Sequence, residues 1–396
     1  MPDRTLLRAA LLEDPAAPSR APGALLIEGA RIAARWALDA PPPPDAAVVD
    51  VAGSLAPGLI DVHYHGDLVL REPHDALSAL RAASASLARH GVTAFLPTTV
   101  AWPAAELPGR IAHLVEALAI GGWPGAVPIG LHLEGPWIRA EAAGAQPAAG
   151  IRPYAPAEGR ALFDRAGAAI RMVTLAPELD GAPELQEELV RRSITIAIGH
   201  TLADPSSIDA AIAGGARHAT HLFNAMGALH QRGPGVAGRV LGDDRLSCDV
   251  IADGAHVHCD WLRVAARAKG ERLILISDRI DASDPAAVRR SGFGSGPMHS
   301  DGVAWRLADG RLAGSHLWLD DAVRNVAAWR VMDRHDAIRA CTLGPARLLG
   351  IEAERGTLRA GARADFAVFD RTGQLQATWV GGRPLPLPPR QLDRPE

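Results

Sequence analysis

The sequence predicts an α/β fold: a parallel (β/α)8 barrel of the TIM type, joined to a small β-domain built from both chain ends. Short runs of Val, Ile and Leu, each followed by Gly or polar residues, are typical of buried parallel strands. Segments with helical patterns lie between most of these runs, as helical crossovers in a parallel sheet require. His, Glu and Asp residues stand where several of the runs end. In a parallel barrel these ends meet at one rim, where the active site lies.

The barrel is predicted over residues 57–350. Helical stretches are expected at 75–90, 108–118, 183–192 and 205–214, between successive strands. Eight candidate strands are present, which is the number that a (β/α)8 barrel needs. These strands end near His63, Pro97, Leu133, Leu175, Gly199, His221, Ala252 and Ser277.

Both ends of the chain carry β-like runs, which we expect to pair into one small β-domain with the barrel inserted between them. The N-terminal part is residues 1–56, in which the proline run 41–44 makes a stiff connector, and the C-terminal part is residues 351–384. Residues 385–396, rich in Pro and Arg, are predicted to form a disordered tail. The β-like runs lie at 5–12, 24–36, 47–51, 364–369 and 375–380.

Composition narrows the class of protein and its compartment. The 396 residues are 48% hydrophobic and 22% charged, which suits a globular protein with a sizeable core. A net charge of −4 predicts no general attraction to nucleic acid or to an anionic membrane. The uncharged stretches are broken by Gly and Pro, as in 117–133, so no membrane-spanning helix is expected. Cys248, Cys259 and Cys341 follow no disulfide or zinc spacing, and the start of the chain lacks a signal-peptide core, so a cytoplasmic protein is expected.

The residues at the strand ends predict a metal site. His63 and His65 form a His-x-His pair on a strand, and period-two alternation puts both imidazoles on one face. Glu134 ends another apolar run, where a lone buried carboxylate would be costly without a counter-charge. Any one of the histidines could be an ordinary hydrogen-bonded residue, but the set has the ligand chemistry of zinc-like ions. The remaining members of the set are His200, His221 and Asp278.

The only lysine of the chain bears on how two metal ions would be bridged. Some two-metal hydrolases use a carboxylated lysine at a strand end as the bridge. Lys269 instead follows a helical stretch, 261–268, directly before Gly270. A bridging group in this chain is therefore expected to be a carboxylate, for which Glu134 is the candidate.

Several motifs resemble those of the N-acetylglucosamine-6-phosphate deacetylases, a family within the amidohydrolase superfamily. The resemblance covers nearly the whole chain, and its Glu-Gly-Pro and Thr-His-Leu-x-Asn-Ala-Met signatures are specific to this group and its close relatives. A further motif at 356–365 is shared more broadly in the superfamily. The motifs are His63-Tyr64-His65-Gly66, His-Leu-Glu-Gly-Pro at 132–136, Gly-His-Thr at 199–201, Thr-His-Leu-Phe-Asn-Ala-Met at 220–226, Asp-Gly-Ala-His-Val at 253–257 and Leu-Ala-Gly-Ser at 312–315.

The resemblance implies a divalent-metal cofactor, expected to be zinc, with one or two ions per chain. Glu134, His200 and His221 would hold the main ion. Family members with a His-x-His motif can hold two ions, so His63 and His65 would hold the second, with Glu134 bridging. Asp278 would act as general base and then general acid.

The same resemblance implies the residues that bind the substrate. Asn224 and Ala225 would contact it, and Gln146 stands where many relatives have a His that polarises the acetyl carbonyl. Arg232 and His256 would engage a phosphate, for which a forked guanidinium is well suited. Alternatively, Arg232 is a solvated surface arginine and His256 is a structural histidine of a loop. Phosphate contacts in the family can come from a neighbouring subunit, which implies a homodimer.

Two departures from the family pattern concern specificity. Arg279 follows Asp278 where relatives have Ala, so it could depress the pKa of that carboxyl or recognise an anionic substrate. Gly233 replaces a Glu in the motif that contains Arg232. The expected activity is hydrolysis of N-acetylglucosamine 6-phosphate to glucosamine 6-phosphate and acetate. The alternatives are hydrolysis of another N-acyl substrate, such as an N-acyl amino acid read by Arg279, and an inactive scaffold, against which the intact ligand set argues.

Overall fold

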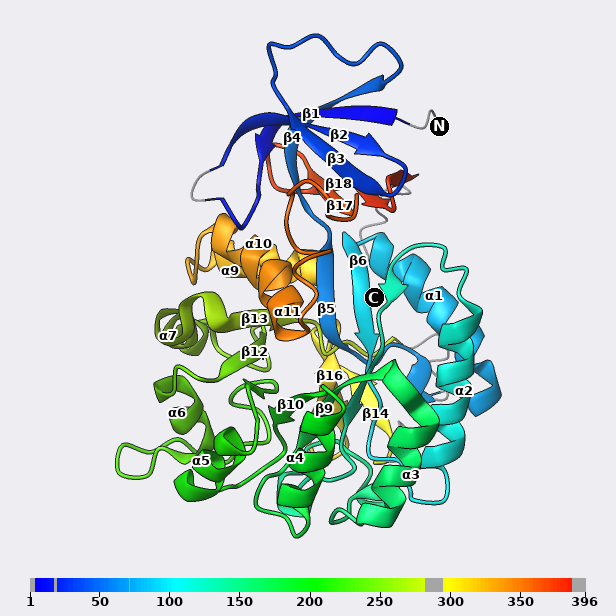
Figure 1. Cartoon of the computed structure of the whole chain (residues 1–396). Coiled ribbons are helices and arrows are strands. Elements are labelled where there is room, and N and C mark those ends of the chain that lie inside the picture. Colours follow the sequence, from blue (N-terminus) through cyan, green and yellow to red (C-terminus); the bar gives the residue numbers. More distant parts are fainter. Residues whose placement is uncertain (1–3, 18–19, 71, 282–294, 387–396) are drawn as a thin grey trace.

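A computed structural model describes residues 4–17, 20–70, 72–281 and 295–386. A twisted β-sheet lies at one end of the molecule, and an α/β part with helices on its outside makes up the rest (Figure 1). Within the described residues, no helix combines the length and the apolar character that crossing a membrane needs.

The sheet at one end unites the two ends of the chain. Its strand order is β19-β18-β17-β4-β1-β2-β3, and β17 pairs antiparallel with β4. Its buried core includes Leu7, Leu25, Phe366 and Trp379. The division of the chain into separate domains remains a prediction. The strands are β1 (Arg4–Leu12), β2 (Ala21–Glu28), β3 (Arg31–Trp36), β4 (Ala47–Pro57), β17 (Phe366–Phe369), β18 (Leu375–Val380) and β19 (Arg383–Pro386).

One prediction for the C-terminal segment is wrong. Leu385 and Pro386, assigned above to a disordered tail, belong to β19 and pair with Thr378 and Ala377 of β18. Proline is tolerated there because β19 is the edge strand of the sheet. The rest of the predicted tail, 387–396, lies outside the described residues.

Parallel strands form the centre of the α/β part. Within the described residues they make a curled six-stranded sheet of order β13-β12-β11-β10-β9-β8 and a second sheet of order β5-β6-β7. Each of the eight predicted strand ends lies within two residues of an observed one, whereas the short β7 was not predicted. The strands are β5 (Leu59–Tyr64), β6 (Val92–Pro97), β7 (Val127–Pro128), β8 (Leu131–Glu134), β9 (Ile170–Leu175), β10 (Thr195–Ile198), β11 (His218–Ala219), β12 (Ser247–Ile251) and β13 (Leu273–Ile276).

The two parallel sheets meet through isolated bridges rather than continuous ladders. Thr98, just after β6, bridges to His132 of β8, and Tyr64 of β5 bridges to Arg279, just after β13. Strand β6 packs beside β8, and β13 packs beside β5. The sequence predicted a closed eight-stranded barrel. Within the described residues, the hydrogen bonding between strands does not run continuously around such a barrel, so its closure stays a prediction.

Helices cover the outside of the parallel strands, and each predicted helical stretch overlaps an observed helix. In α4, Leu185 and Leu189 are buried against the strands, as expected for an amphipathic helix. In α5, Asp204 caps the first turn by accepting a hydrogen bond from the backbone N–H of Ser207. The helices are α1 (Ala76–Ala88), α2 (Leu107–Ile120), α3 (Pro156–Ala166), α4 (Ala182–Arg191), α5 (Pro205–Ala213), α6 (Gly235–Gly242), α7 (Cys259–Lys269), α9 (Leu319–Ala328), α10 (Arg334–Cys341) and α11 (Leu343–Leu348), and 3-10 turns lie at Leu68–Leu70, Pro73–Asp75, Ala140–Ala142, Ala148–Gly150, Gly167–Ala169 and Gly270–Arg272.

A small antiparallel sheet after β13 was not predicted. It consists of β14 (Met298–Ser300), β15 (Ala304–Leu307) and β16 (Leu312–Ser315). Ser315 bridges to Arg279, which fixes the end of β16 beside the end of β13. The sheet therefore adds a wall next to the carboxyl ends of the parallel strands.

Candidate active site

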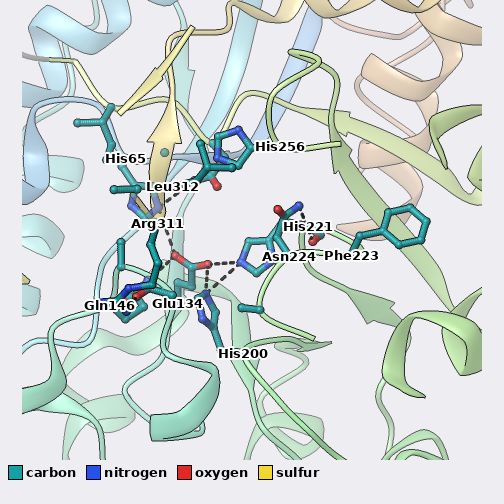
Figure 2. A pocket seen from close by; sticks show the side chains of 17 residues that line it. His65, Glu134, Gln146, His200, His221, Phe223, Asn224, His256, Arg311 and Leu312 are labelled. Atoms are coloured by element: carbon teal, nitrogen blue, oxygen red, sulfur yellow. Dashed lines mark hydrogen bonds and ion pairs between the residues drawn. The ribbon is translucent and has the colours of Figure 1, made fainter. Parts of the chain in front are cut away.

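Six predicted site residues gather where the parallel strands end. His63 and Glu134 lie at the ends of β5 and β8, and the others follow β5, β10, β11 and β13 directly. Five of the six line a pocket of about 290 Å³, and all six are buried. Figure 2 shows the carboxylate of Glu134 at the centre of this group, with histidines around it. The six are His63, His65, Glu134, His200, His221 and Asp278.

The backbone turns sharply where three of these side chains leave their strands. His200, His221 and Asp278 have φ angles of 49°, 35° and 47°. Residues with a Cβ adopt positive φ uncommonly, and such conformations cluster at functional sites. The turns end the strands and aim the three side chains into the pocket.

Glu134 presents a different carboxylate oxygen to each of two histidine pairs. Its Oε1 lies 3.0 Å from Nε2 of His200 and 2.9 Å from Nε2 of His221. Its Oε2 lies 3.4 Å from Nε2 of His63 and 3.2 Å from Nε2 of His65. In each triad the potential ligand atoms lie within 4.8 Å of one another. The arrangement provides two adjacent cation sites that share one carboxylate.

The charges of the site favour a bound cation. Burial by itself would raise the pKa of Glu134, but the neighbouring imidazoles, His63 foremost, hold that pKa well below its usual range. Burial disfavours a charged His65, yet its hydrogen bonds to Asp278 and Glu134 raise its pKa to about 10. Burial likewise opposes charge on His221, and Glu134 raises its pKa to about 9. The carboxylates thus attract positive charge, which protons or a divalent ion can supply.

The hydrogen bonds made by Nδ1 of His65 and of His200 also fit metal binding. Nδ1 of His65 lies 3.1 Å from the carbonyl oxygen of Thr98, and Nδ1 of His200 lies 2.9 Å from that of Ala142. A carbonyl only accepts, so each Nδ1 carries a hydrogen, and each Nε2 is the nitrogen that can bind an ion once a metal displaces any proton on it. These tautomers are the ones that metal-binding histidines need.

Asp278 lies beside the His63 and His65 pair. Its Oδ1 is 3.4 Å from Nε2 of His63 and 3.2 Å from Nε2 of His65. Burial raises its pKa, but these two imidazoles outweigh burial and lower it. Its backbone N–H donates to the carbonyl of His63 at 2.9 Å, and its carbonyl accepts from Ser315 of β16 at 2.9 Å. Asp278 is therefore an ionised carboxylate on a firmly held backbone.

Buried polar residues beneath the site were not predicted as functional. Asp249 of β12 accepts a hydrogen bond from the backbone N–H of His221, and its Oδ2 lies 2.9 Å from Nε2 of His218. The ring of His132 lies 4.7 Å from that of His63, and its Nε2 lies 2.7 Å from the hydroxyl of Thr174. Side chains alternate between the two faces of a strand, and this alternation along β8 and β12 could have placed these residues behind the site.

The predicted substrate-binding residues divide into two groups. Four of the five, Gln146, Asn224, Ala225 and His256, line the pocket. Arg232 is exposed in the turn where His230 pairs with Gly233, and it is absent from the described residues that line the pocket. Phe223, Arg311 and Leu312 also line it (Figure 2). Phe223 and Leu312 lie in the motifs at 220–226 and 312–315 but were not predicted as pocket residues, and Arg311 was missed altogether.

Arg279 contacts residues of its own chain beside the pocket. Its Nε donates to Oδ1 of Asp281 at 2.7 Å, and its guanidinium lies 3.6 Å above the ring of Trp318. It is absent from the described residues that line the pocket, so the structure gives no support for its contact with an anionic substrate. The lowered pKa of Asp278 follows instead from His63 and His65.

Lys269 is buried away from the pocket. Its Nζ donates to the carbonyl oxygens of Val240 at 2.9 Å and Asp243 at 2.8 Å, at the C-terminal end of α6. The single lysine of the chain thus has a structural contact, in agreement with the expectation that it does not bridge metal ions.

Comparisons with known proteins define the class. The model of the amidohydrolase family matches residues 54–385. N-acetylglucosamine-6-phosphate deacetylase of Homo sapiens is 36% identical over 340 residues, 83% of this chain and 82% of the relative. N-acetylgalactosamine-6-phosphate deacetylase of Escherichia coli O157:H7 is 34% identical over 329 residues, 83% of this chain and 87% of the relative. The chain therefore belongs to the amidohydrolase family and is a hydrolytic enzyme.

Solved structures agree with this assignment. A variant of N-acetyl-D-glucosamine-6-phosphate deacetylase from Mycobacterium smegmatis, in complex with N-acetyl-D-glucosamine-6-phosphate, superposes with a TM-score of 0.84 at 30% identity, covering 96% of this chain and 99% of that chain. The enzyme of the same name from Thermotoga maritima gives 0.83 at 26% identity, with coverages of 96% and 99%. The resemblance to the N-acetylglucosamine-6-phosphate deacetylases is thus confirmed. The family is metal-dependent, and both His/Glu triads can hold an ion.

Proposed function

We propose that this protein hydrolyses the acetamide of N-acetylglucosamine 6-phosphate, giving glucosamine 6-phosphate and acetate. The observation that carries the proposal is the pocket in which Glu134 joins two histidine pairs beside Asp278. The names of the relatives described above supply the substrate class.

Zinc is the metal we propose, because imidazole and carboxylate are ligands that it accepts. Glu134, His200 and His221 would hold the main ion, and His63 and His65 would hold a second, with Glu134 bridging. When bound there, a divalent ion supplies Lewis-acid activation of a water and of the acetyl carbonyl.

Asp278 would move the proton during the reaction. Its lowered pKa keeps Oδ1 ionised at neutral pH, so this oxygen can take a proton from the attacking water. The same oxygen would then give the proton to the leaving amine, without which the C–N bond does not break readily. The backbone contacts of Asp278 to His63 and Ser315 hold the carboxylate in place for both transfers.

The remaining pocket residues would orient the sugar. Asn224 and Ala225 would contact it, and His256, fixed by Asp253 at 2.6 Å, would face the phosphate. Arg232 is exposed and outside the pocket of its own chain, so we propose that it reaches the phosphate bound in the partner subunit of a homodimer.

A steady-state assay tests the proposed substrate. N-acetylglucosamine 6-phosphate, N-acetylgalactosamine 6-phosphate, unphosphorylated N-acetylglucosamine and N-acetyl amino acids would be compared by kcat/KM. The galactosamine isomer is included because one relative carries its name. The first sugar should have the highest kcat/KM. Turnover of N-acetyl amino acids alone would refute the proposal, and Arg279 no longer favours that alternative because Asp281 and Trp318 hold it.

We also propose that the barrel is closed, that the chain divides into two domains, and that the protein is cytoplasmic. The two bridges between the parallel sheets support a closed (β/α)8 barrel over 57–350, with a small β-domain from 1–56 and 351–384. An experimental structure tests closure of the barrel. The cytoplasm is the proposed compartment, which fractionation of the source cells would test.

A further inference from the structure

Gln146 uses both ends of its side-chain amide, and the two contacts fix how the amide is turned. Its Oε1 accepts a hydrogen bond from the backbone N–H of Ala101 at 2.8 Å, and its Nε2 donates to Oε2 of Glu134 at 2.7 Å. A backbone N–H only donates and an ionised carboxylate only accepts, so a reversed amide would lose both bonds. The NH2 end of Gln146 therefore faces Glu134 (Figure 2).

The oxygen that this amide contacts is the one that faces His63 and His65. Oε2 of Glu134 lies 3.4 Å and 3.2 Å from their Nε2 atoms, whereas Oε1 faces His200 and His221. The terminal torsion of a glutamate is broad, so the side chain itself sets the plane of the carboxylate only weakly. The amide holds Oε2 toward one histidine pair and so leaves Oε1 for the other.

The loop that carries Gln146 is braced on both sides. A Cβ at Gly150 would lie 1.7 Å from the carbonyl oxygen of Ala101, so the loop packs directly against that backbone. On the other side, Arg311, in the turn between β15 and β16, donates to the carbonyl of Gly144. Gln146 is itself only 7% exposed. A side chain held in this way can impose its orientation on the carboxylate.

We propose that Gln146 is a positioning residue that orients Glu134 as the bridge between the two metal sites. The inference rests on the metal sites proposed above and differs from the substrate contact expected of this position. Loss of a polar partner of a metal ligand typically weakens metal binding about 10- to 100-fold. Of the two oxygens of Glu134, Gln146 contacts only Oε2, so its loss should weaken the ion at His63 and His65 more than the ion at His200 and His221.

The test is a metal-binding measurement on the full-length protein. Wild type and Gln146→Met would be dialysed against buffers of fixed free Zn²⁺, and bound zinc would be counted by elemental analysis. Met has a similar length but makes neither hydrogen bond. Gln146→Met should raise the apparent Kd of the ion at His63 and His65, identified as the one missing from the His63→Asn with His65→Asn variant, about 10- to 100-fold, with a smaller change for the other ion. Gln146→Asn, too short to span both partners, gives a second variant with the same expected result.

Gln186→Met is the matched control. Gln186 is buried and donates to the carbonyl of Ala211 at 2.9 Å, between α4 and α5, so the same substitution there should leave both ions unchanged. Equal weakening of both ions, or no weakening, would overturn the inference. So would uptake of a single ion by wild type, or a raised KM with normal metal binding. The sugar assay on wild type tests the proposed function separately, because two-ion binding with no turnover would refute that function alone.

Discussion

Oδ1 of Asp278 lies 3.2 Å from Nε2 of His65, so the proposed proton-transfer residue touches a proposed metal ligand. The contact joins the end of β13 to the end of β5, and the hydrogen bond from the backbone of Asp278 to the carbonyl of His63 supports it. Proton transfer and metal binding are therefore neighbouring but separable tasks, which substitutions can test one at a time.

Asp278→Asn should remove proton transfer while keeping the fold and the metal. The amide has nearly the same shape but cannot accept a proton, so kcat should fall on the order of 10²–10⁴-fold. Turnover of N-acetylglucosamine 6-phosphate and zinc content would be measured on the same sample. A kcat near that of wild type would move the proton-transfer role to another residue.

Glu134→Gln should abolish binding of both ions, because each triad depends on one oxygen of this carboxylate. The double variant His63→Asn with His65→Asn should lose one ion and keep the other. Elemental analysis after dialysis in zinc buffer would count the ions. Full metal content in the Glu134 variant would contradict the ligand assignment.

The metal-free protein should lose stability as the pH rises from 7 to 8.5. The pKa values of His65 and His221 are raised to about 10 and about 9 in the folded chain, above the ordinary value of 6.5. The folded state therefore holds protons that the unfolded state releases, so the stabilisation is complete below pH 6.5 and is lost as the pH rises toward 9–10. Thermal unfolding of chelated protein would measure the slope of Tm against pH.

Metal-free Glu134→Gln serves as the control for this pH dependence. Glu134 raises the pKa of both histidines, so its removal should make the fall in Tm shallower. A Tm that stayed constant or rose over this interval in the wild-type protein would argue against protonated histidines in the empty site.

Arg232→Ala should raise KM for the phosphosugar about ten- to a hundredfold, as expected for loss of a charge-assisted contact, and leave KM for the unphosphorylated sugar little changed. The same KM values would be measured for Arg311→Ala, which removes an arginine that, unlike Arg232, lines the pocket of its own chain. Equal losses on both sugars would make Arg232 structural.

Mixed dimers would test whether Arg232 acts across subunits. Asp278→Asn and Arg232→Ala chains would be co-expressed with different tags and the mixed species purified. In the mixed dimer, the intact Asp278 of one chain would meet the intact Arg232 of the other, so a low KM for the phosphosugar should return. A KM equal to that of the Arg232→Ala homodimer would place its action within one chain.

The parts that sequence predicted best depend on local pattern. Apolar runs ended by Gly or a polar residue placed the strand ends within two residues, because a buried parallel strand must be apolar along its length. The small antiparallel sheet escaped prediction because its strands are short. Its core also forms against Ile280 and Ala145, which are distant in sequence from most of it.

Pocket residues outside the strand ends were harder to identify. Arg311 resembles the many other arginines of the chain, and only the fold of β15 and β16 brings it to the pocket. One of the two hydrogen-bond partners of Gln146 is the backbone N–H of Ala101, and the residue type at that position does not indicate this contact. Arg279 looked functional from its position beside Asp278, but it contacts Asp281 and the indole of Trp318, which lies far along the chain.

The pairing of β4 with β17 has a consequence for synthesis of the chain. Strand β4 can pair with β1 as soon as both have left the ribosome, but its other edge, which includes Leu55, waits for Val368 near the end of the chain. An unpaired strand edge is a template for association with other chains. Fragments that end before Phe366 would carry this open edge permanently, so they should aggregate even when the catalytic strands are all present.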